Sequence, residues 1–257
     1  MKLVLITIFI ISTSSSFAWT LNSNTGNGFS NNEINIYIAN TSCDGAGMTT
    51  EQFRGLTKSA VKHYWNSVPT SRLYLNVKEI RTDIDITGDT HAEALLKVPN
   101  NSIVAGCNTS ADQFSNSSIL GSAVSSCSGS TCKAVLILNA NAASNLPTKS
   151  DSELEAVIAH EIGHAFGLGH SEYKESLMYY SISGKYQKWL GEDDVDGVSY
   201  LYPNESELDV LGISLLGNCG AIASTDSEKG IQLIDWIVSL LFGFLIPVLL
   251  IKKILRI

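Results

Sequence analysis

The sequence predicts an α/β domain with an apolar segment near each end of the chain. Strand-like and helix-like stretches follow one another in the order strand, helix, strand, strand, strand, helix, an order that is typical of α/β domains. Apolar residues make up 44% of the 257 residues, which is enough for a buried core. Charged residues make up only 16% and the net charge is −8, so the chain lacks the basic surface that nucleic-acid binding requires.

Residues 1–18 have the pattern of a cleaved signal peptide. Lys2 precedes an apolar run over residues 3–11, and the small residues Ser16 and Ala18 occupy the −3 and −1 positions before Trp19. A membrane anchor is the alternative, but the run is shorter than the ~20 residues that span a bilayer. We therefore expect an exported protein whose folded part begins at residue 19.

Three elements are expected in the first part of the exported chain. Residues 34–39 (INIYIA) alternate polar and β-branched side chains, which predicts a strand. Residues 50–66 follow a threonine cap and carry apolar side chains at helical spacing, among them Phe53 and Trp65, which predicts an amphipathic helix. Residues 73–80 predict a second strand.

The later elements lead up to the functional motif. Residues 102–105 predict a short third strand, and the continuous apolar run at 134–138 (AVLIL) predicts a buried or edge-packed one. Residues 108–130 are rich in Ser, Asn and Gly and are expected to form loops. A helix is expected to begin near Ser150 or Ser152, because each is followed three residues later by Glu, as in a capping box.

The five cysteines indicate an oxidising compartment. Cys43, Cys107, Cys127 and Cys132 lie in the folded part and allow three pairings, among which sequence cannot choose. The short loop between Cys127 and Cys132 favours that pair together with Cys43–Cys107. Free buried thiols are the alternative.

Three of the five histidines fall within eleven residues, from His160 to His170. His160 and His164 are one helical turn apart, so their imidazoles project from the same side of the predicted helix. Gly167 can adopt a left-handed conformation and end the helix, which allows the chain to bring His170 back to the same point. Three neutral imidazoles and a water form the open arrangement of a catalytic zinc site.

Glu161 lies between the two helical ligands and can reach a metal-bound water without binding the metal. Zinc lowers the pKa of such a water to roughly 7. We therefore expect Glu161 to take the proton as general base and to pass it to the leaving amine. The alternative is a group of ordinary surface or core histidines, and the restrictive spacing of the full motif argues against it.

The run HEIGHAFGLGHS at residues 160–171 resembles the zinc-binding motif of the metzincin metallopeptidases, and within them that of the matrixins, the matrix-metalloprotease group. Ser171 after the third histidine suits the matrixins, as does Met178, eight residues beyond His170. Residues 190–198 resemble the start of the family's C-terminal helix. The strong match covers residues 150–203.

The resemblance implies a metzincin-like catalytic domain at residues 19–203, with a twisted, mainly parallel sheet, an active-site helix and a C-terminal helix. It implies one catalytic zinc ion, with Met178 in a hydrophobic floor beneath the metal. It also implies that Asp193 or Asp194 supports the turn around Met178 (the Met-turn), and that one of them can pair with a processed N-terminus; helix capping is the alternative. Family members often bind Ca²⁺, but no compact acidic loop here indicates a calcium site.

The sequence also departs from the matrixin pattern. Matrixins usually place proline two residues after the Met-turn methionine, where this chain has Tyr180. Residues 176–180 (SLMYY) instead resemble the SxMxY of astacins and serralysins, in which the tyrosine is a switchable zinc ligand. Tyr180 is thus expected either to touch the metal or the oxyanion, or simply to pack within the turn. No cysteine-switch segment is found before the first strand, and the isolated His63 and His91 do not indicate a second zinc site.

The C-terminal part predicts attachment to a membrane. Residues 204–230 are polar and are expected to form a stalk, and residues 231–251 are long and apolar enough for a transmembrane helix. The basic tail at 252–257 favours the cytoplasmic side. A buried helix is one alternative. Another is a bacterial sorting signal, because Gly-Asn-Cys-Gly precedes the apolar and basic segments; a C-terminal sorting protease would then cut near Cys219.

Together these observations predict an exported zinc endopeptidase, anchored at the cell surface or released outside, with a cytoplasmic C-terminus before any processing. Its expected partners are protein or peptide substrates of the extracellular space or the envelope, and the membrane. Two alternatives stay open: a catalytically inactive surface binding protein on the same scaffold, and a zinc hydrolase of a non-peptide amide. The intact Glu161 argues against the first.

Overall fold

A computed structural model describes residues 19–22, 28–110, 114, 116–181 and 189–204. The predicted signal peptide (1–18), transmembrane helix (231–251), basic tail (252–257) and Cys219 lie outside these residues, as does all of the predicted stalk beyond residue 204. None of the helices in the described part of the chain combines the length and apolar character needed to cross a membrane.

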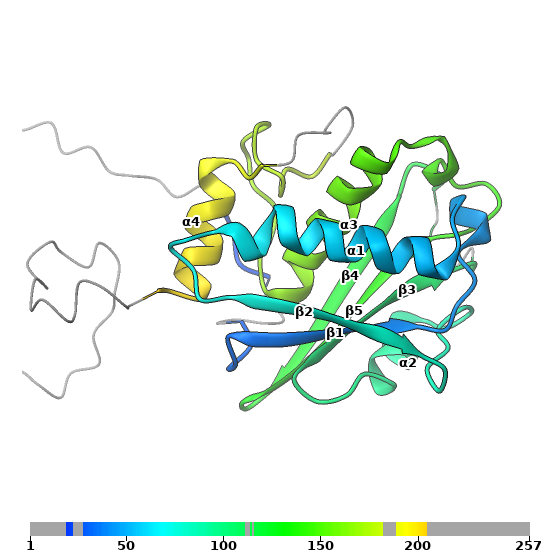
Figure 1. Ribbon diagram of the computed structural model, residues 1–257, viewed down its shortest axis with the longest axis horizontal. Helices are drawn as coiled ribbons and strands as arrows, with labels where there is room; N and C mark the ends of the chain where they lie inside the picture. The colour runs from blue at the N-terminus through cyan, green and yellow to red at the C-terminus, as the bar shows by residue number, and fades with distance from the viewer. Residues whose placement is uncertain (1–18, 23–27, 111–113, 115, 182–188, 205–257) are drawn as a thin grey trace, which may run out of the picture. The chain divides into compact units, whose positions relative to one another are not determined.

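The domain is built on a five-stranded sheet in the order β2-β1-β3-β5-β4 (Figure 1). The strands are β1 (Glu33–Ala39), β2 (Tyr74–Arg81), β3 (Ser102–Asn108), β4 (Gly121–Ser128) and β5 (Thr131–Asn139). The first four in spatial order run parallel, and β4 pairs antiparallel with β5 at the edge. This confirms the predicted α/β class with a mainly parallel sheet.

Strand β4 corrects the expectation that residues 108–130 form loops only. Its sequence, GSAVSSCS, has little of the apolar alternation that predicts a strand. It forms because every residue from Gly121 to Ser128 pairs with a residue of β5, through a hairpin whose turn includes Gly129 at a φ of +59°. Pairing with an apolar neighbour here outweighs the weak strand propensity of the segment itself.

The helices agree with the sequence apart from their ends and one omission. Helix α1 (Thr50–His63) is followed by the 3-10 turn η2 (Trp65–Ser67), so the predicted helix at 50–66 changes type in its last turn. Helix α3 (Asp151–Phe166) is capped by Ser150, the first of the two expected caps, and α4 (Glu192–Leu201) is the C-terminal helix. The sequence did not predict α2 (His91–Leu96), because six residues are too few to show a helical period.

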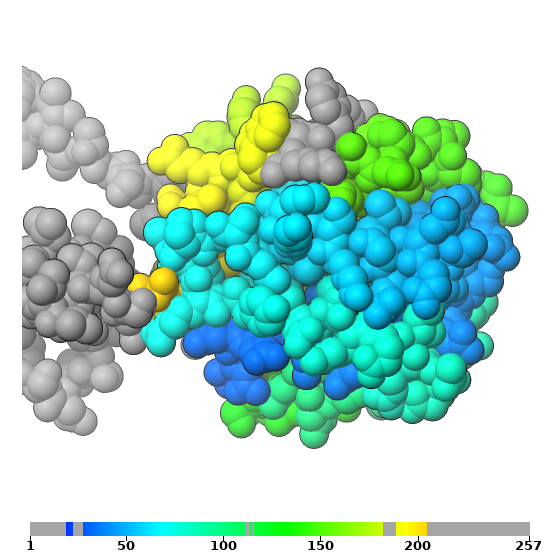
Figure 2. Space-filling view, viewed as in Figure 1, coloured from blue at the N-terminus to red at the C-terminus, as the bar shows by residue number. Residues whose placement is uncertain are grey.

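Both faces of the sheet are buried, on different partners. Leu136 and Leu138 of β5 belong to the larger core, which also contains apolar residues of α1 and α3. Val135 and Ile137, which alternate with them, belong to a smaller core with Ala94 of α2. The continuous apolar run of β5 therefore reflects a strand covered on both sides. In the space-filling view, α1 in blue and cyan occupies the middle of the near side (Figure 2).

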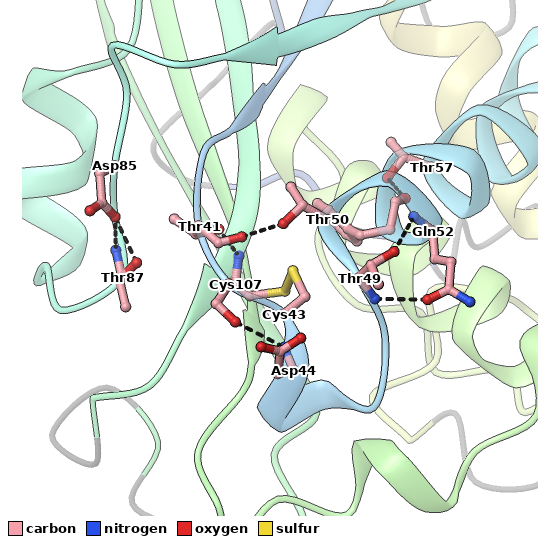
Figure 3. The surroundings of a disulfide bond; sticks show 12 residues. Thr41, Cys43, Asp44, Thr49, Thr50, Gln52, Thr57, Asp85, Thr87 and Cys107 are labelled. Carbon is pink, nitrogen blue, oxygen red and sulfur yellow. Dashed lines mark hydrogen bonds between the residues drawn. A yellow bond between two sulfur atoms is a disulfide. The ribbon is translucent and has the colours of Figure 1, made fainter.

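Two disulfides reinforce this framework, with the pairing that the sequence favoured. Cys43–Cys107 joins the segment after β1 to β3, next to the start of α1 (Figure 3). Thr41 completes this junction, since its Oγ1 accepts a hydrogen bond from Cys107 N at 3.0 Å. Cys127–Cys132 joins directly opposed residues of β4 and β5.

Candidate metal centre and active site

Helix α3 places two histidines on one side, toward a cleft. His160 and His164 project one turn apart, and their Nε2 atoms lie 3.1 Å from each other. The helix is held rigidly, because its other faces are packed in the core through residues such as Ile158, Ile162 and Ala165, all fully buried. Trp65 adds a hydrogen bond from its indole Nε1 to Ala159 O at 2.9 Å.

Gly167 ends α3 and reverses the chain. Its φ of +133° lies in the region that residues with a side chain rarely adopt. The Leu168 N–H then donates to Gly163 O at 2.9 Å, and the following loop returns toward the helix. As a result His170 Nε2 lies 3.2 Å from His164 Nε2, so the three histidines converge as the sequence predicted.

The outer nitrogens of the first two imidazoles define their tautomers. His160 Nδ1 lies 2.7 Å from Leu177 O, and His164 Nδ1 lies 2.8 Å from Leu168 O. Because a carbonyl only accepts hydrogen bonds, each Nδ1 carries the proton and each Nε2 presents a lone pair. Burial also lowers the pKa of His164 to about 4, which keeps this imidazole neutral.

Lone pairs that meet at such distances repel one another unless a cation lies between them. Zn–N bonds of 2.0–2.1 Å in a tetrahedral site separate the ligand atoms by about 3.3 Å, close to the observed 3.1 and 3.2 Å. His160, His164 and His170 thus fit a zinc ion with an open fourth position. They form the only cluster of three or more candidate ligands among the residues that the structure describes.

The other two histidines have different surroundings. His63 Nδ1 on α1 lies 3.2 Å from Ser59 Oγ and 3.6 Å from the buried carboxylate of Glu155. His91 begins α2, which packs on the opposite side of the sheet from α3. Neither belongs to the metal cluster.

Glu161 lies between α3 and the edge strand β4. Only 8% of the residue is exposed, and a Cβ added to Gly121 would lie 3.0 Å from Glu161 Cγ. Glycine at position 121 thus leaves room for the carboxylate to approach the cleft. Burial raises the pKa of Glu161 to about 8.

Met178 lies beneath the metal-binding turn of α3. It is 1% exposed, and its Sδ occupies the space that a side chain at position 163 would need. Gly163 stands between His160 and His164, so the methionine packs against the backbone that carries both. Leu177, its neighbour, supplies the carbonyl that binds His160.

Asp194 holds the Met-turn from α4. Its carboxylate accepts hydrogen bonds from Leu177 N at 2.6 Å, from Met178 N at 2.9 Å and from the Ser176 hydroxyl. It also accepts one from Gly191 N at 2.8 Å, so it caps α4 as well. Both expected roles therefore fall on one residue. Asp193 is also buried, and its Oδ2 has no hydrogen-bond partner within the described part of the chain.

A cleft of ≈ 700 Å³ runs beside this centre. One side is formed by β4 and the loop before it, including Ile119 and Gly121, and the other by α3. Glu161, Val157 and Glu153 line it at the four-residue spacing of one face of α3, and Lys149, just before the helix, lines it as well, so the cleft extends along α3 to its N-terminal end.

Tyr180 also lines the cleft. It is 68% exposed, and its ring contacts that of Tyr179 at a tilt of 45°, with centroids 4.3 Å apart. It is thus neither buried in the turn nor within a described contact of the three histidines.

Sequence reasoning missed Asn22, which also lines the cleft. Its Nδ2 donates to His164 O at 3.1 Å, across 142 residues of sequence. No pattern near residue 22 indicates such a long-range contact.

Comparison with known proteins gives a consistent result. The family model described as Matrixin matches residues 28–203, well over half of the chain. The chain is 55% identical to the metalloendoproteinase 2-MMP of Arabidopsis thaliana over 51 residues, which are 20% of this chain and 14% of that protein. It is 47% identical to metalloendoproteinase 1 of Glycine max over 57 residues (22% and 19%) and 47% identical to mouse matrix metalloproteinase-19 over 55 residues (21% and 10%). The matched part is thus at most 19% of the length of these relatives.

Proposed function

The chain belongs to the matrixin family, and from this premise we propose that it is a zinc endopeptidase in which Glu161 is the general base. One observation carries the proposal. Three imidazole Nε2 atoms converge next to a buried carboxylate at the side of an open cleft. This is the set of groups that metal-assisted hydrolysis of an amide needs.

We assign the metal to the three histidines. His160, His164 and His170 would hold it through Nε2, while Leu177 O and Leu168 O keep the first two rings in orientation. A bound zinc ion supplies Lewis acidity, which polarises a carbonyl group and lowers the pKa of water.

Glu161 moves the proton in this proposal. Its carboxylate takes a proton from the attacking water and returns it to the nitrogen of the leaving amine. Burial raises the pKa of Glu161 above its usual range, which strengthens its carboxylate as a proton acceptor. Met178 and Asp194 take no part in the transfer and act by holding the turn beneath the histidines.

The substrate class follows from the cleft. An extended chain can add to the outer edge of β4, since that strand pairs with β5 on one side only. Ile119, Leu120 and Val157 provide apolar surface along the cleft, so a peptide with an apolar side chain next to the cut bond fits best. Tyr180, exposed on the cleft, would contact this substrate or the oxyanion. No observation favours an inactive binding protein or the hydrolysis of a non-peptide amide.

Peptide cleavage by the full chain tests the proposal. We expect cleavage of a mixed peptide library that is lost with a zinc chelator and restored by zinc. Glu161→Gln should keep one zinc per chain but lower kcat by a factor of 10² to 10⁴, the usual contribution of a general base. Asp151→Asn, at an exposed carboxylate of α3 outside the residues that line the cleft, is the matched control and should retain most of kcat. Cleavage by Glu161→Gln at the parent rate would refute the assignment.

We also propose that the enzyme works outside the cell and is attached to the membrane, from the sequence at residues 1–18 and 231–257. Mass spectrometry of the mature protein tests this. The expected N-terminus is Trp19, and an intact Arg256 would argue for a permanent anchor and against cleavage near Cys219.

A further inference from the structure

Residues 19–22 run alongside the loop that carries His170, which is the one histidine of the three that lies outside α3. Asn22 N donates to Gly167 O at 2.8 Å, and Gly169 N donates to Thr20 O at 2.7 Å. Leu21 and Leu168, between these bonds, form an antiparallel bridge. We call residues 19–22 the clamp segment.

Two side chains of the clamp segment reach the ligand residues themselves. Thr20 Oγ1 donates to His170 O at 2.8 Å. Asn22 Nδ2 donates to His164 O at 3.1 Å and lies 3.3 Å from Ser125 Oγ on β4. The clamp segment therefore binds the main chain of two of the three histidines.

The main chain around His170 is held from two sides. The residue before it is bound to Thr20, and the residue after it is bound to the Met-turn, since Ser171 N donates to Met178 O at 2.9 Å. His160 and His164 differ in this respect, because the helical hydrogen bonds of α3 hold them. The position of the third ligand thus depends on the clamp segment on one side and on the Met-turn on the other.

Helix α4 anchors the clamp segment. The Trp19 ring lies 4.9 Å from that of Tyr200, and it faces the open side of Gly197, where an added Cβ would lie 3.5 Å from the indole. Leu168 packs against the same glycine, at 2.9 Å from such a Cβ. Helix α4 thus supports the metal-binding loop directly as well as through the clamp segment.

We propose that the clamp segment sets the zinc affinity of the site, with Thr20 and Asn22 as positioning residues for His170 and His164. The inference rests on the proposed function, because it takes the three histidines as zinc ligands. Its physical reason is preorganisation: without the clamp, the loop 167–170 must become ordered when the metal binds, and that loss of entropy weakens binding.

Zinc affinity of full-chain variants, measured by competition with a chromophoric chelator, tests the proposal. Thr20→Val removes the hydroxyl and keeps the shape, and Asn22→Ala removes the amide. We expect each to raise the zinc Kd about tenfold, the lower end of what outer-sphere substitutions do, and to speed zinc loss into excess chelator. Thr20→Ser keeps the donor and should restore the parent Kd to within about twofold.

Thr70→Val is the matched control, because it removes a hydroxyl that meets Ser199 Oγ at 2.6 Å, at a position outside the cleft. It should leave the zinc Kd unchanged. In chemical unfolding of the zinc-free forms, Thr20→Val and Thr70→Val should lower the free energy of unfolding by similar small amounts. A zinc Kd equal to that of the parent in both Thr20→Val and Asn22→Ala would contradict the proposed role of the clamp segment. A rise of the zinc Kd in Thr70→Val as large as that in Thr20→Val would contradict it as well. A parent chain that binds no zinc would instead overturn the proposed function.

Discussion

Replacing Asp194 by alanine should destabilise the domain and weaken its metal centre together. Asp194 is 1% exposed and its carboxylate accepts the hydrogen bond of Leu177 N, whereas Met178 N has a second acceptor in Ser176 Oγ at 3.1 Å. The substitution therefore leaves one buried N–H without a partner and removes several charge-assisted bonds.

The magnitude follows from these contacts. An orphaned buried donor costs about 1–3 kcal/mol, and each lost bond to a charged group about as much, although such terms do not add fully. Gly191 N and the Ser176 hydroxyl can find other partners, since the first is only partly buried and the second rotates. We expect the free energy of unfolding of the zinc-free domain to fall by about 3 kcal/mol.

Urea unfolding of the full chain without zinc measures this loss, and chelator competition measures the zinc Kd. Asp196→Ala, on the same helix, is the control, because Asp196 accepts none of the bonds to the Met-turn; it should change stability by less than about 0.5 kcal/mol. A loss below about 1 kcal/mol for Asp194→Ala would refute the supporting role. If the free energy of unfolding falls by about 3 kcal/mol as expected but the zinc Kd is unchanged, the Met-turn does not position His160.

Three further changes give separate tests. Gly167→Ala should lower the free energy of unfolding by about 1–3 kcal/mol and raise the zinc Kd, because φ there is +133°; a parent-like urea midpoint would contradict this. Replacing Cys43 and Cys107 by alanine should lower the free energy of unfolding by about 4 kcal/mol, because their disulfide closes a loop of 64 residues. Replacing Cys127 and Cys132 should lower it by about half as much, because that loop spans 5 residues; equal losses would contradict the loop-entropy reasoning. Tyr202→Phe should lower the free energy of unfolding by about 2 kcal/mol, because the Tyr202 hydroxyl donates to Phe166 O and accepts from Phe29 N. An unchanged thermal midpoint would refute this prediction.

The elements that could be predicted are those whose defining residues lie close together in the sequence. Helix α3 has its cap, its apolar residues and its terminating glycine within eighteen consecutive positions, from Ser150 to Gly167. Strand β5 has a continuous apolar run. Strand β4 was missed because its stability comes from pairing with β5 and not from its own serine-rich sequence.

The same distinction applies to the site. The convergence of His160, His164 and His170 could be predicted, because one helical turn and one glycine set their geometry. The contacts of Thr20 and Asn22 could not, because 142 to 150 residues separate the partners and hydrogen bonds to main-chain carbonyls leave no spacing pattern. The resemblance implied that Asp193 or Asp194 supports the turn, and the structure adds that Asp194 does so and that the same carboxylate caps α4.

Because of these contacts, the geometry of the metal centre depends on segments outside the histidine motif. Helix α3 brings two imidazoles to one side, and carbonyl groups of Leu177 and Leu168 orient them, but the third depends on a loop held between residues 19–22 and the Met-turn. Both of those supports lie against α4, through Trp19 and through Asp194. A change at Asp194 or Gly197 of α4 should therefore weaken zinc binding although every histidine stays in place, whereas an equally destabilising change in β2, at the far edge of the sheet from β4, should not.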